Sequence, residues 1–285
     1  SLYLAGFHGA NGFHFSDGLE TLPFFEYTIM AQFLKLISYP LSVIHYLVFG
    51  LLLLIFHPIQ WLAFNVLGRK AHRATVIALN IGLTWSLYFL FSRVKFINKH
   101  KVPEGVPIII VSNHQSTYDI PPMYMYFRKH FPNFVSKIEL GKGIPSVSYN
   151  LRHGDNVLIE RKDPRQAINT LMKFGEKIEK ENLVAVIFPE GTRSKTAVPK
   201  PFRESGLKMM VKKSPSSYII PLSINNSWRL VRKGAFPLGV GIKVTMEAHE
   251  PIKSDSMPFP ELLEKTEKTI NAALLKLNPS GEPFN

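Results

Sequence analysis

The chain has 285 residues, and 34 lysines and arginines against 21 aspartates and glutamates give it a formal charge of +13. It contains no cysteine, which excludes disulfides, thiolate metal sites and cysteine nucleophiles. Residues 1–90 hold only four basic and three acidic residues, which leaves 30 basic and 18 acidic ones for the rest. This surplus favours nucleic acid, an anionic membrane or a phosphorylated molecule as partner, although lysines also keep ordinary surfaces soluble.

Residues 1–28 are rich in glycine and aromatic side chains and show no helix or strand periodicity. They lack the basic region that begins a secretory signal. We therefore predict that residues 1–28 are a leader or a remnant of cloning.

The next segment, residues 33–67, is strongly apolar. Between residues 41 and 56 its only ionisable side chain is His45. The stretch is long enough for the roughly 20 residues that a helix needs to cross a bilayer core. Pro40 interrupts it, and we expect Pro58 to break the helical pattern.

A second apolar stretch, residues 74–92, follows a basic cluster made of Arg69, Lys70, His72 and Arg73. Asn80 and Thr84 lie near one helical face, so this helix is amphipathic. We predict that residues 29–92 are membrane-anchoring helices. They form either a transmembrane hairpin or a hairpin within one leaflet, with the basic residues on the headgroups. The amphipathic helix favours the one-leaflet form, and two core helices of a soluble protein are the third possibility.

From residue 93 onward, short apolar runs alternate with helical patterns. Runs rich in valine and isoleucine predict strands at 106–112, 133–138, 155–160, 183–188, 218–224 and 241–248. Helices are predicted at 120–130, 164–181, 203–213 and 259–277. Asp163 can cap the second of these, and Pro164 suits its first position. We therefore predict an α/β domain over residues 93–285, with a mostly parallel central sheet flanked by helices and preceded by a membrane-embedded hairpin.

The stretch "NHQSTYD", residues 113–119, follows the first predicted strand. His114 then lies at the carboxyl end of that strand, where open α/β sheets bind ligands. If the loop folds back, Asp119 can accept the imidazole Nδ1–H and leave Nε2 free to take a proton, as in a general-base dyad. A structural histidine beside a capping aspartate is the competing interpretation.

A second motif, "FPEGTRS" at residues 188–194, follows another predicted strand. Gly191 lets the backbone approach a ligand closely, and Arg193 offers a planar fork suited to phosphate oxygens. An ordinary turn with a surface arginine is the alternative. Lys137 and Arg161 follow two further strands. Together these residues predict a proton acceptor beside an anion pocket.

The chain resembles the glycerolipid acyltransferases, in particular the bacterial 1-acylglycerol-3-phosphate acyltransferases. Their block N-H-x-x-x-x-D is matched by Asn113, His114 and Asp119. Their block F-P-E-G-T-R-S is matched by residues 188–194. Their lysine block, arginine block and proline-containing strand are matched by Lys137, Arg161 and Pro221. The resemblance covers about residues 93–250, and it lacks the aromatic residue often found before the arginine.

The resemblance implies transfer of an acyl group from acyl-CoA or acyl carrier protein to lysophosphatidic acid, making phosphatidic acid in phospholipid biosynthesis. His114 and Asp119 would be the catalytic dyad, without a covalent acyl-enzyme. The acceptor phosphate would be bound by Glu190, Gly191, Thr192, Arg193, Lys137 and Arg161, with Glu190 orienting the loop. Support would come from Asn113, Ser194 and Pro221.

The resemblance further implies an anionic phospholipid membrane as partner, at the cytoplasmic face of a bacterial inner membrane. We expect no metal ion, no cofactor and no nucleic-acid partner. An acyltransferase for another lysolipid is the first alternative. A membrane-bound lipid hydrolase is the second, although the chain has no G-x-S-x-G elbow. A non-catalytic lipid carrier is the third, and it would leave the His114–Asp119 pair unexplained.

Overall fold

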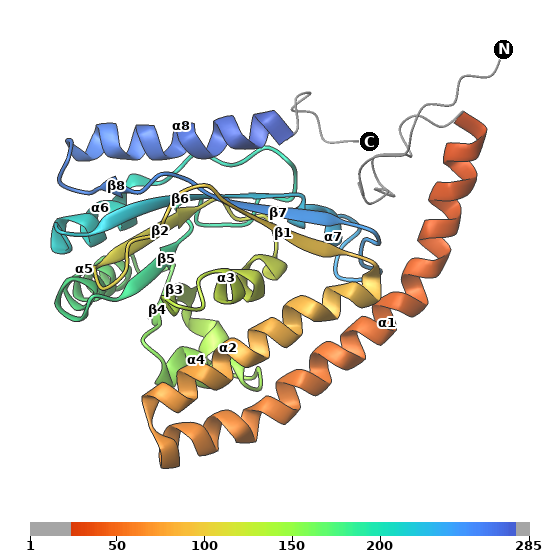
Figure 1. The fold of residues 1–285 in the computed structure, drawn as a ribbon, viewed down its shortest axis with the longest axis horizontal. Helices are drawn as coiled ribbons and strands as arrows, with labels where there is room; N and C mark the ends of the chain where they lie inside the picture. Colours follow the sequence, from red (N-terminus) through yellow and green to blue (C-terminus); the bar gives the residue numbers. More distant parts are fainter. Residues whose placement is uncertain (1–23, 278–285) are drawn as a thin grey trace.

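The structure is a computed structural model that describes residues 24–277 (Figure 1). Its strands are β1 Arg93–Asn98, β2 Ile108–Ser112, β3 Pro132–Lys137, β4 Val157–Ile159, β5 Val184–Ile187, β6 Tyr218–Asn225, β7 Lys243–Ala248 and β8 Ile252–Lys253. Its α-helices are α1 Phe24–Leu62, α2 Arg69–Trp85, α3 Ile120–Tyr126, α4 Val147–His153, α5 Pro164–Glu181, α6 Glu204–Lys213, α7 Ser227–Leu230 and α8 Phe259–Leu277. Shorter helical turns are η2 Ala63–Leu67, η3 Ser86–Leu90, η4 Thr117–Asp119 and η5 Ile138–Gly141.

The strands form one eight-stranded sheet in the order β1-β7-β6-β2-β5-β3-β4, with β8 beside β6. The central strands β6, β2, β5, β3 and β4 pair in parallel. The edge pair β1 and β7 is parallel within itself but antiparallel to β6. The sheet is therefore mostly parallel, which confirms the predicted fold class.

Two apolar layers cover the faces of this sheet, and β2 shows how. Ile109 and Val111 pack with α5, α6 and α8, whereas Ile108 and Ile110 pack with α2 and α3. Successive side chains of a strand point to opposite faces, so a central strand buried on both faces reads as an unbroken apolar run. That is why the run at residues 106–112 was recognisable from sequence.

All six predicted strands are present, but β1 and β8 were not predicted. β1 is an edge strand that pairs only with β7, and Arg93 and Lys95 break its apolar pattern. The predicted cap of α5 is present, with the Asp163 side chain accepting from the Gln166 N–H at 3.0 Å. The helix predicted at 120–130 ends earlier, at Tyr126.

The apolar N-terminal segment is a helical hairpin, and the expected break at Pro58 is wrong. α1 continues through both Pro40 and Pro58. A proline removes one backbone hydrogen bond, and a long helix tolerates that loss when neighbouring contacts hold it. The turn comes instead at Gly68, whose φ of +82° favours glycine. The predicted leader lies outside the described residues up to residue 23, and residues 24–28 belong to α1.

The hairpin lies along the domain, with α2 between α1 and α3 (Figure 1). At its tip, Arg69 and Arg73 pair with the buried Asp155 at 3.3 and 2.6 Å. Near its other end, the Leu238 N–H donates to Ser42 Oγ at 2.9 Å. His72 is buried too and packs on Phe64 and Tyr149. Three of the four residues expected on lipid headgroups therefore contact the protein itself, the two arginines because a buried carboxylate needs cationic partners.

Two helical segments of the hairpin are long and apolar enough to cross a membrane by length and composition. They are Gln32–Leu67, with mean hydropathy 2.1, and Arg69–Leu90, with mean hydropathy 1.2. Most of the first segment is exposed in the protein, and nearly half of the second is buried. The exposed apolar surface of the hairpin is therefore concentrated on α1.

Candidate active site

The end of β2 is fixed to β6 by the side chain of Asn113. Its Nδ2 donates to the Ile224 carbonyl and its Oδ1 accepts from the Ile224 N–H, both at 2.8 Å. The side chain is fully buried, so both of its polar atoms need these partners. Asn113 thereby sets the position from which the chain turns to His114.

His114 and Asp119 are in direct contact. His114 Nδ1 lies 2.8 Å from Asp119 Oδ2. A carboxylate accepts here, so the proton resides on Nδ1 and the lone pair of the neutral ring lies on Nε2. Within the described residues Nε2 has no hydrogen-bond partner. The side chain is 17 % exposed, so a substrate hydroxyl can reach it.

The Asp119 carboxylate is completely buried and held by several donors. Its Oδ2 also accepts from the N–H groups of Gln115 and Ser116, at 2.8 and 2.9 Å. Its Oδ1 accepts from the hydroxyl of Ser227 in α7. Donors of this kind compensate the loss of water around a buried carboxylate. The Asp119 carboxylate, which accepts from His114, is therefore held in one orientation.

The motif at residues 188–194 lies at the same sheet edge, because β5 is the parallel neighbour of β2. The Ser194 N–H donates to the His114 carbonyl at 2.7 Å. The His114 N–H donates to Glu190 Oε1 at 2.8 Å. The loop of residues 113–119, called the histidine loop, and the loop of residues 188–194, called the arginine loop, are thus joined through the backbone of His114.

Glu190 is a buried residue of the arginine loop whose carboxylate accepts hydrogen bonds from two other segments. Its Oε2 accepts from the Lys200 N–H at 3.0 Å, while its other oxygen binds His114. Burial raises the pKa of this carboxyl group, against the two backbone donors and the nearby charges of His114 and Lys200. Each carboxylate oxygen of Glu190 thus accepts one backbone N–H, which links His114 to the segment before α6.

Arg193 reaches from its loop to the histidine loop. Its Nη1 donates to Thr117 Oγ1 at 2.5 Å. Gly191 has a φ of +70°, and a side chain there would lie 3.5 Å from the guanidinium of Arg203. The positive φ favours glycine at this position, whereas a Cβ at 3.5 Å would make an ordinary van der Waals contact with Arg203.

Two cations near this loop were not predicted as site residues: Lys200 and Arg203. Lys200 Nζ donates to Thr192 Oγ1 at 2.8 Å and to the Arg193 carbonyl at 3.1 Å. The Arg203 N–H donates to the Pro189 carbonyl at 3.0 Å. The stretch "PKPFR" after the motif carries a signal, namely two cations in a segment with two prolines, and its last residue is the first of the predicted helix 203–213.

Arg161 joins the same cluster of cations. Burial lowers its pKa, and the positive charges of Arg203 and Arg193 lower it further against the opposing charge of Glu139. Among residues 24–277, none of these three guanidiniums forms an ion pair with a carboxylate. Three positive charges with a single nearby carboxylate, Glu139, repel one another in the folded state, so this arrangement favours an anionic ligand.

Lys137 and Pro221 are placed differently. Lys137 ends β3, which is separated from β2 by β5, and no hydrogen bond joins it to the cluster in the described part of the chain. Pro221 lies inside β6, opposite Val111, and its carbonyl accepts from the His249 N–H at 2.9 Å. Ser194 closes its own loop by donating to the Val198 carbonyl at 2.5 Å.

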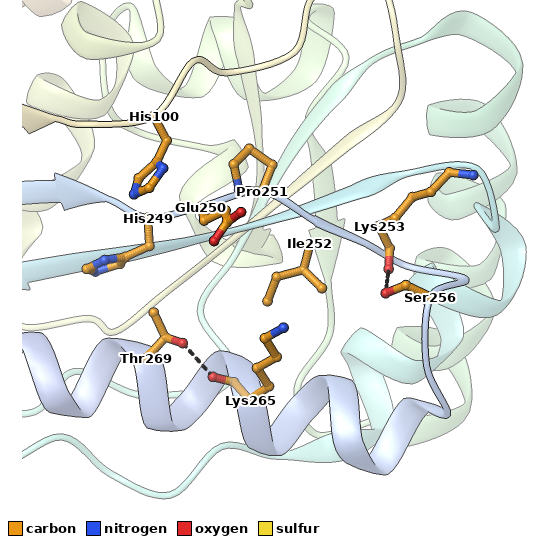
Figure 2. A pocket seen from close by; sticks show the side chains of 9 residues that line it. All are labelled: His100, His249, Glu250, Pro251, Ile252, Lys253, Ser256, Lys265 and Thr269. Carbon is orange, nitrogen blue, oxygen red and sulfur yellow. Dashed lines mark hydrogen bonds between the residues drawn. The ribbon is translucent and has the colours of Figure 1, made fainter.

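A hollow of about 380 Å³ lies away from these residues, between α8 and the segment from β7 to β8. Figure 2 shows His100 and His249 at one end, Lys253 and Ser256 at the other, and Lys265 on α8 between them. His249 bonds Ser223 Oγ at 2.7 Å, and burial lowers its pKa. None of the predicted site residues lines this hollow. Across the described residues, no group of three or more histidine or acidic side chains could hold a metal ion.

The comparisons with known proteins agree with this geometry. Residues 93–225 match the model of the Acyltransferase family. The chain is 28 % identical over 215 residues to the 1-acyl-sn-glycerol-3-phosphate acyltransferase of Helicobacter pylori, covering 73 % of this chain and 84 % of that protein. It is 24 % identical over 198 residues to the human 1-acyl-sn-glycerol-3-phosphate acyltransferase beta, covering 68 % and 69 %.

A solved structure has the same fold. The crystal structure of the 1-acyl-sn-glycerophosphate (LPA) acyltransferase PlsC from Thermotoga maritima superposes with a TM-score of 0.69 at 25 % identity, covering 83 % of this chain and 94 % of that one. The fold and the site thus define an acyltransferase. The matches confirm the resemblance to the glycerolipid acyltransferases seen in the motifs of the chain.

Proposed function

We propose that this acyltransferase transfers an acyl group from a thioester, acyl-CoA or acyl carrier protein, to the free hydroxyl of 1-acylglycerol-3-phosphate, making phosphatidic acid. One observation carries the proposal. The His114–Asp119 pair, joined at 2.8 Å, lies on a loop hydrogen-bonded to the loop of Arg193. A base with a free Nε2 beside an unpaired cation cluster suits an acceptor that carries both a hydroxyl and a phosphate. The names of the relatives support this choice of acceptor.

In the proposed reaction, His114 Nε2 takes the proton of the acceptor hydroxyl as the oxygen attacks the thioester carbonyl. Asp119 stabilises the imidazolium that forms. The tetrahedral intermediate then expels the thiolate, which takes the proton back from Nε2. One C–O bond forms and one C–S bond breaks, without an acyl-enzyme. A positioned general base contributes roughly 10²–10⁴-fold, and orientation of the two substrates supplies much of the remainder.

The acceptor phosphate is proposed to bind Arg193, Arg161 and Arg203, with Lys200 beside them. The charges of Arg193 and Arg203 both act on Arg161, and a phosphate bound among them would offset this repulsion. Guanidinium groups also bind phosphate in bidentate geometry. Lys137 ends β3, which lies in the sheet between β5, the strand before the arginine loop, and β4, the strand before Arg161, so it is proposed as a further cation at this edge.

We further propose that α1 lies in one membrane leaflet with the domain against the headgroups. The exposed apolar side chains of α1 support this, since Leu36, Leu47 and Leu54 are more than 60 % exposed. The ion pair of Arg73 with Asp155 and the hydrogen bond from Leu238 to Ser42 hold the hairpin against the domain, which disfavours a hairpin that spans the bilayer. Following the resemblance to bacterial enzymes, we propose the cytoplasmic face of an inner membrane.

The test is an assay of the purified chain in lipid vesicles, with acyl-CoA or acyl carrier protein and a panel of lysolipids. We expect phosphatidic acid from lysophosphatidic acid and a loss of roughly 10²–10⁴-fold in kcat for His114→Ala. Release of free fatty acid in place of a diacyl product would identify a hydrolase. Preference for an uncharged or zwitterionic acceptor would reject the proposed substrate, and full activity of His114→Ala would reject the mechanism.

A further inference from the structure

A buried histidine connects the hairpin to the loop of the candidate active site. His45 lies in the apolar helix α1 and is completely buried. Its Nδ1 lies 3.0 Å from the Ser86 carbonyl, and its Nε2 lies 3.1 Å from the hydroxyl of Tyr118. A carbonyl can only accept, so Nδ1 donates to Ser86 and Nε2 of the neutral ring accepts from Tyr118. One side chain thus joins α1, η3 and η4.

Tyr118 is the residue directly before Asp119. Its ring is 8 % exposed and packs on His45 and Phe49, with ring centroids 5.6 and 6.2 Å apart. Its neighbours in η4 are bonded as well, Thr117 to Arg193 and Asp119 to Ser227. Three consecutive residues therefore contact three different elements: the arginine loop, α1 and α7.

The turn η4 needs these contacts to hold its position. It is a three-residue 3₁₀ turn, and such short turns have little stability of their own. A displacement of η4 would move the Asp119 carboxylate away from His114 Nδ1, since Asp119 is its last residue. Of these three contacts, the bond from His45 to Tyr118 comes from the hairpin, and the bonds to Arg193 and Ser227 come from the α/β domain.

An apolar side chain at position 45 would be enough to pack α1 against the domain, so packing alone does not require a histidine there. Burying an imidazole in an apolar helix costs free energy unless both nitrogens find partners. Here both do, and one partner is the tyrosine beside the dyad. We propose that His45 is a positioning residue: through Tyr118 it holds Asp119 against His114, so that the seating of α1 controls the acyl-transfer rate. This inference rests on the proposed roles of His114 and Asp119.

The test uses the full chain in vesicles with the variants His45→Phe, Tyr118→Phe and their double. Each substitution keeps a ring of similar size and removes the hydrogen bond between His45 and Tyr118, and His45→Phe also removes the bond to the Ser86 carbonyl. We expect each single variant to lower kcat roughly three- to tenfold, the range that one hydrogen bond is worth, with the KM for the acceptor unchanged. Because the bond between His45 and Tyr118 is lost in both variants, the loss in the double variant should be smaller than the product of the two single losses. Partial recovery of kcat is expected for His45→Gln, whose amide can both donate and accept.

The matched control is His57→Phe in the same helix. His57 Nδ1 accepts from the Ser146 N–H at 3.1 Å, at the start of α4 and away from η4. This control removes a histidine hydrogen bond between α1 and the domain, so it should leave kcat within twofold of the wild type.

Hydrogen exchange gives a readout that does not depend on activity. The N–H groups of Gln115 and Ser116 donate to Asp119, so loosening of η4 should speed their exchange in His45→Phe and Tyr118→Phe but not in His57→Phe. Wild-type kcat in the two variants, multiplying losses in the double, or unchanged exchange would each overturn the positioning role. If the wild type showed no transferase activity, only the proposed function would be rejected. The exchange experiment would still test whether His45 and Tyr118 hold η4 in place.

Discussion

The backbone N–H of His114 donates to Glu190 Oε1 at 2.8 Å, and this bond joins residues 76 positions apart in the chain. A second bond, from the Ser194 N–H to the His114 carbonyl at 2.7 Å, completes the connection. Both peptide groups of the histidine are therefore held by the arginine loop. A ligand held by that loop is consequently fixed relative to the imidazole, which is the geometry that positioned catalysis requires.

Asp119→Asn tests the orienting carboxylate. We expect kcat to fall roughly 10²–10⁴-fold, because an amide can donate to Nδ1 and so stabilise the wrong tautomer of His114. The amide also cannot accept all three bonds that Oδ2 now takes. The measurement is kcat in vesicles together with the thermal unfolding midpoint. Retention of more than half of the wild-type kcat would contradict the orienting role.

Arg203→Ala tests the cation cluster. A charged hydrogen bond is worth about 1.5–3 kcal/mol, so we expect the KM for the phosphorylated acceptor to rise roughly 10- to 100-fold while the KM for the donor stays constant. Removing one of the three like charges should also raise the unfolding midpoint of the ligand-free protein.

The control for the cluster is Arg128→Ala, an exposed arginine that donates only to the Met125 carbonyl within the described residues. It should change neither the KM nor the unfolding midpoint. An unchanged KM in Arg203→Ala would remove this residue from the phosphate site.

Asp155→Asn tests the ion pairs that hold the tip of the hairpin. Burial alone would raise the pKa of Asp155, but Lys177 and Arg73 keep it below its ordinary value of 3.8. The depressed pKa means that the carboxylate stabilises the fold above pH 3.8 and loses this contribution as the pH falls through the folded pKa. At pH 7 we expect the variant to lose about 1.5–3 kcal/mol of unfolding free energy.

Thermal unfolding of wild type and Asp155→Asn between pH 7 and pH 3 measures this effect. The difference between the two proteins should be constant near neutral pH and shrink only below pH 3.8. A difference that stays the same at all pH values would show that the ion pairs contribute no net stability.

Leu47→Asp tests the membrane face of α1. Leu47 is 68 % exposed on α1, and a charge there should reduce vesicle binding roughly tenfold or more, since a carboxylate at membrane depth costs about 2.5–3.5 kcal/mol. Leu275→Asp on α8 is the matched control, because Leu275 is 58 % exposed and lies outside the hairpin. Cosedimentation with vesicles measures both. Equal effects of the two variants would reject α1 as the membrane face.

Lys70→Cys tests whether the hairpin spans the bilayer. The chain contains no cysteine, so a single introduced thiol is a unique label. With protein added to preformed vesicles, a one-leaflet hairpin keeps residue 70 on the outer side, where an impermeant maleimide reacts with it. Lys180→Cys on α5 provides the reference for full labelling. Protection of residue 70 beside full labelling of residue 180 would instead establish a span.

The sequence by itself determined those features whose cause is local. The central strands were predictable because strands buried on both faces are unbroken apolar runs, and α5 was predictable because Asp163 and Pro164 mark its start. The motifs around His114 and Arg193 could be recognised from the sequence alone. The alternation of strands and helices predicted that both motifs follow parallel strands.

Only the tertiary structure decided which distant residues meet. It brought Lys200 and Arg203 to the arginine loop, paired Arg73 with Asp155 and carried α1 through Pro58. It also placed His45 on Tyr118 across 73 positions of sequence. None of these contacts has a local pattern, because each depends on strand order and on burial. Periodicity reports what one segment prefers, whereas a side-chain contact depends on where two segments are packed.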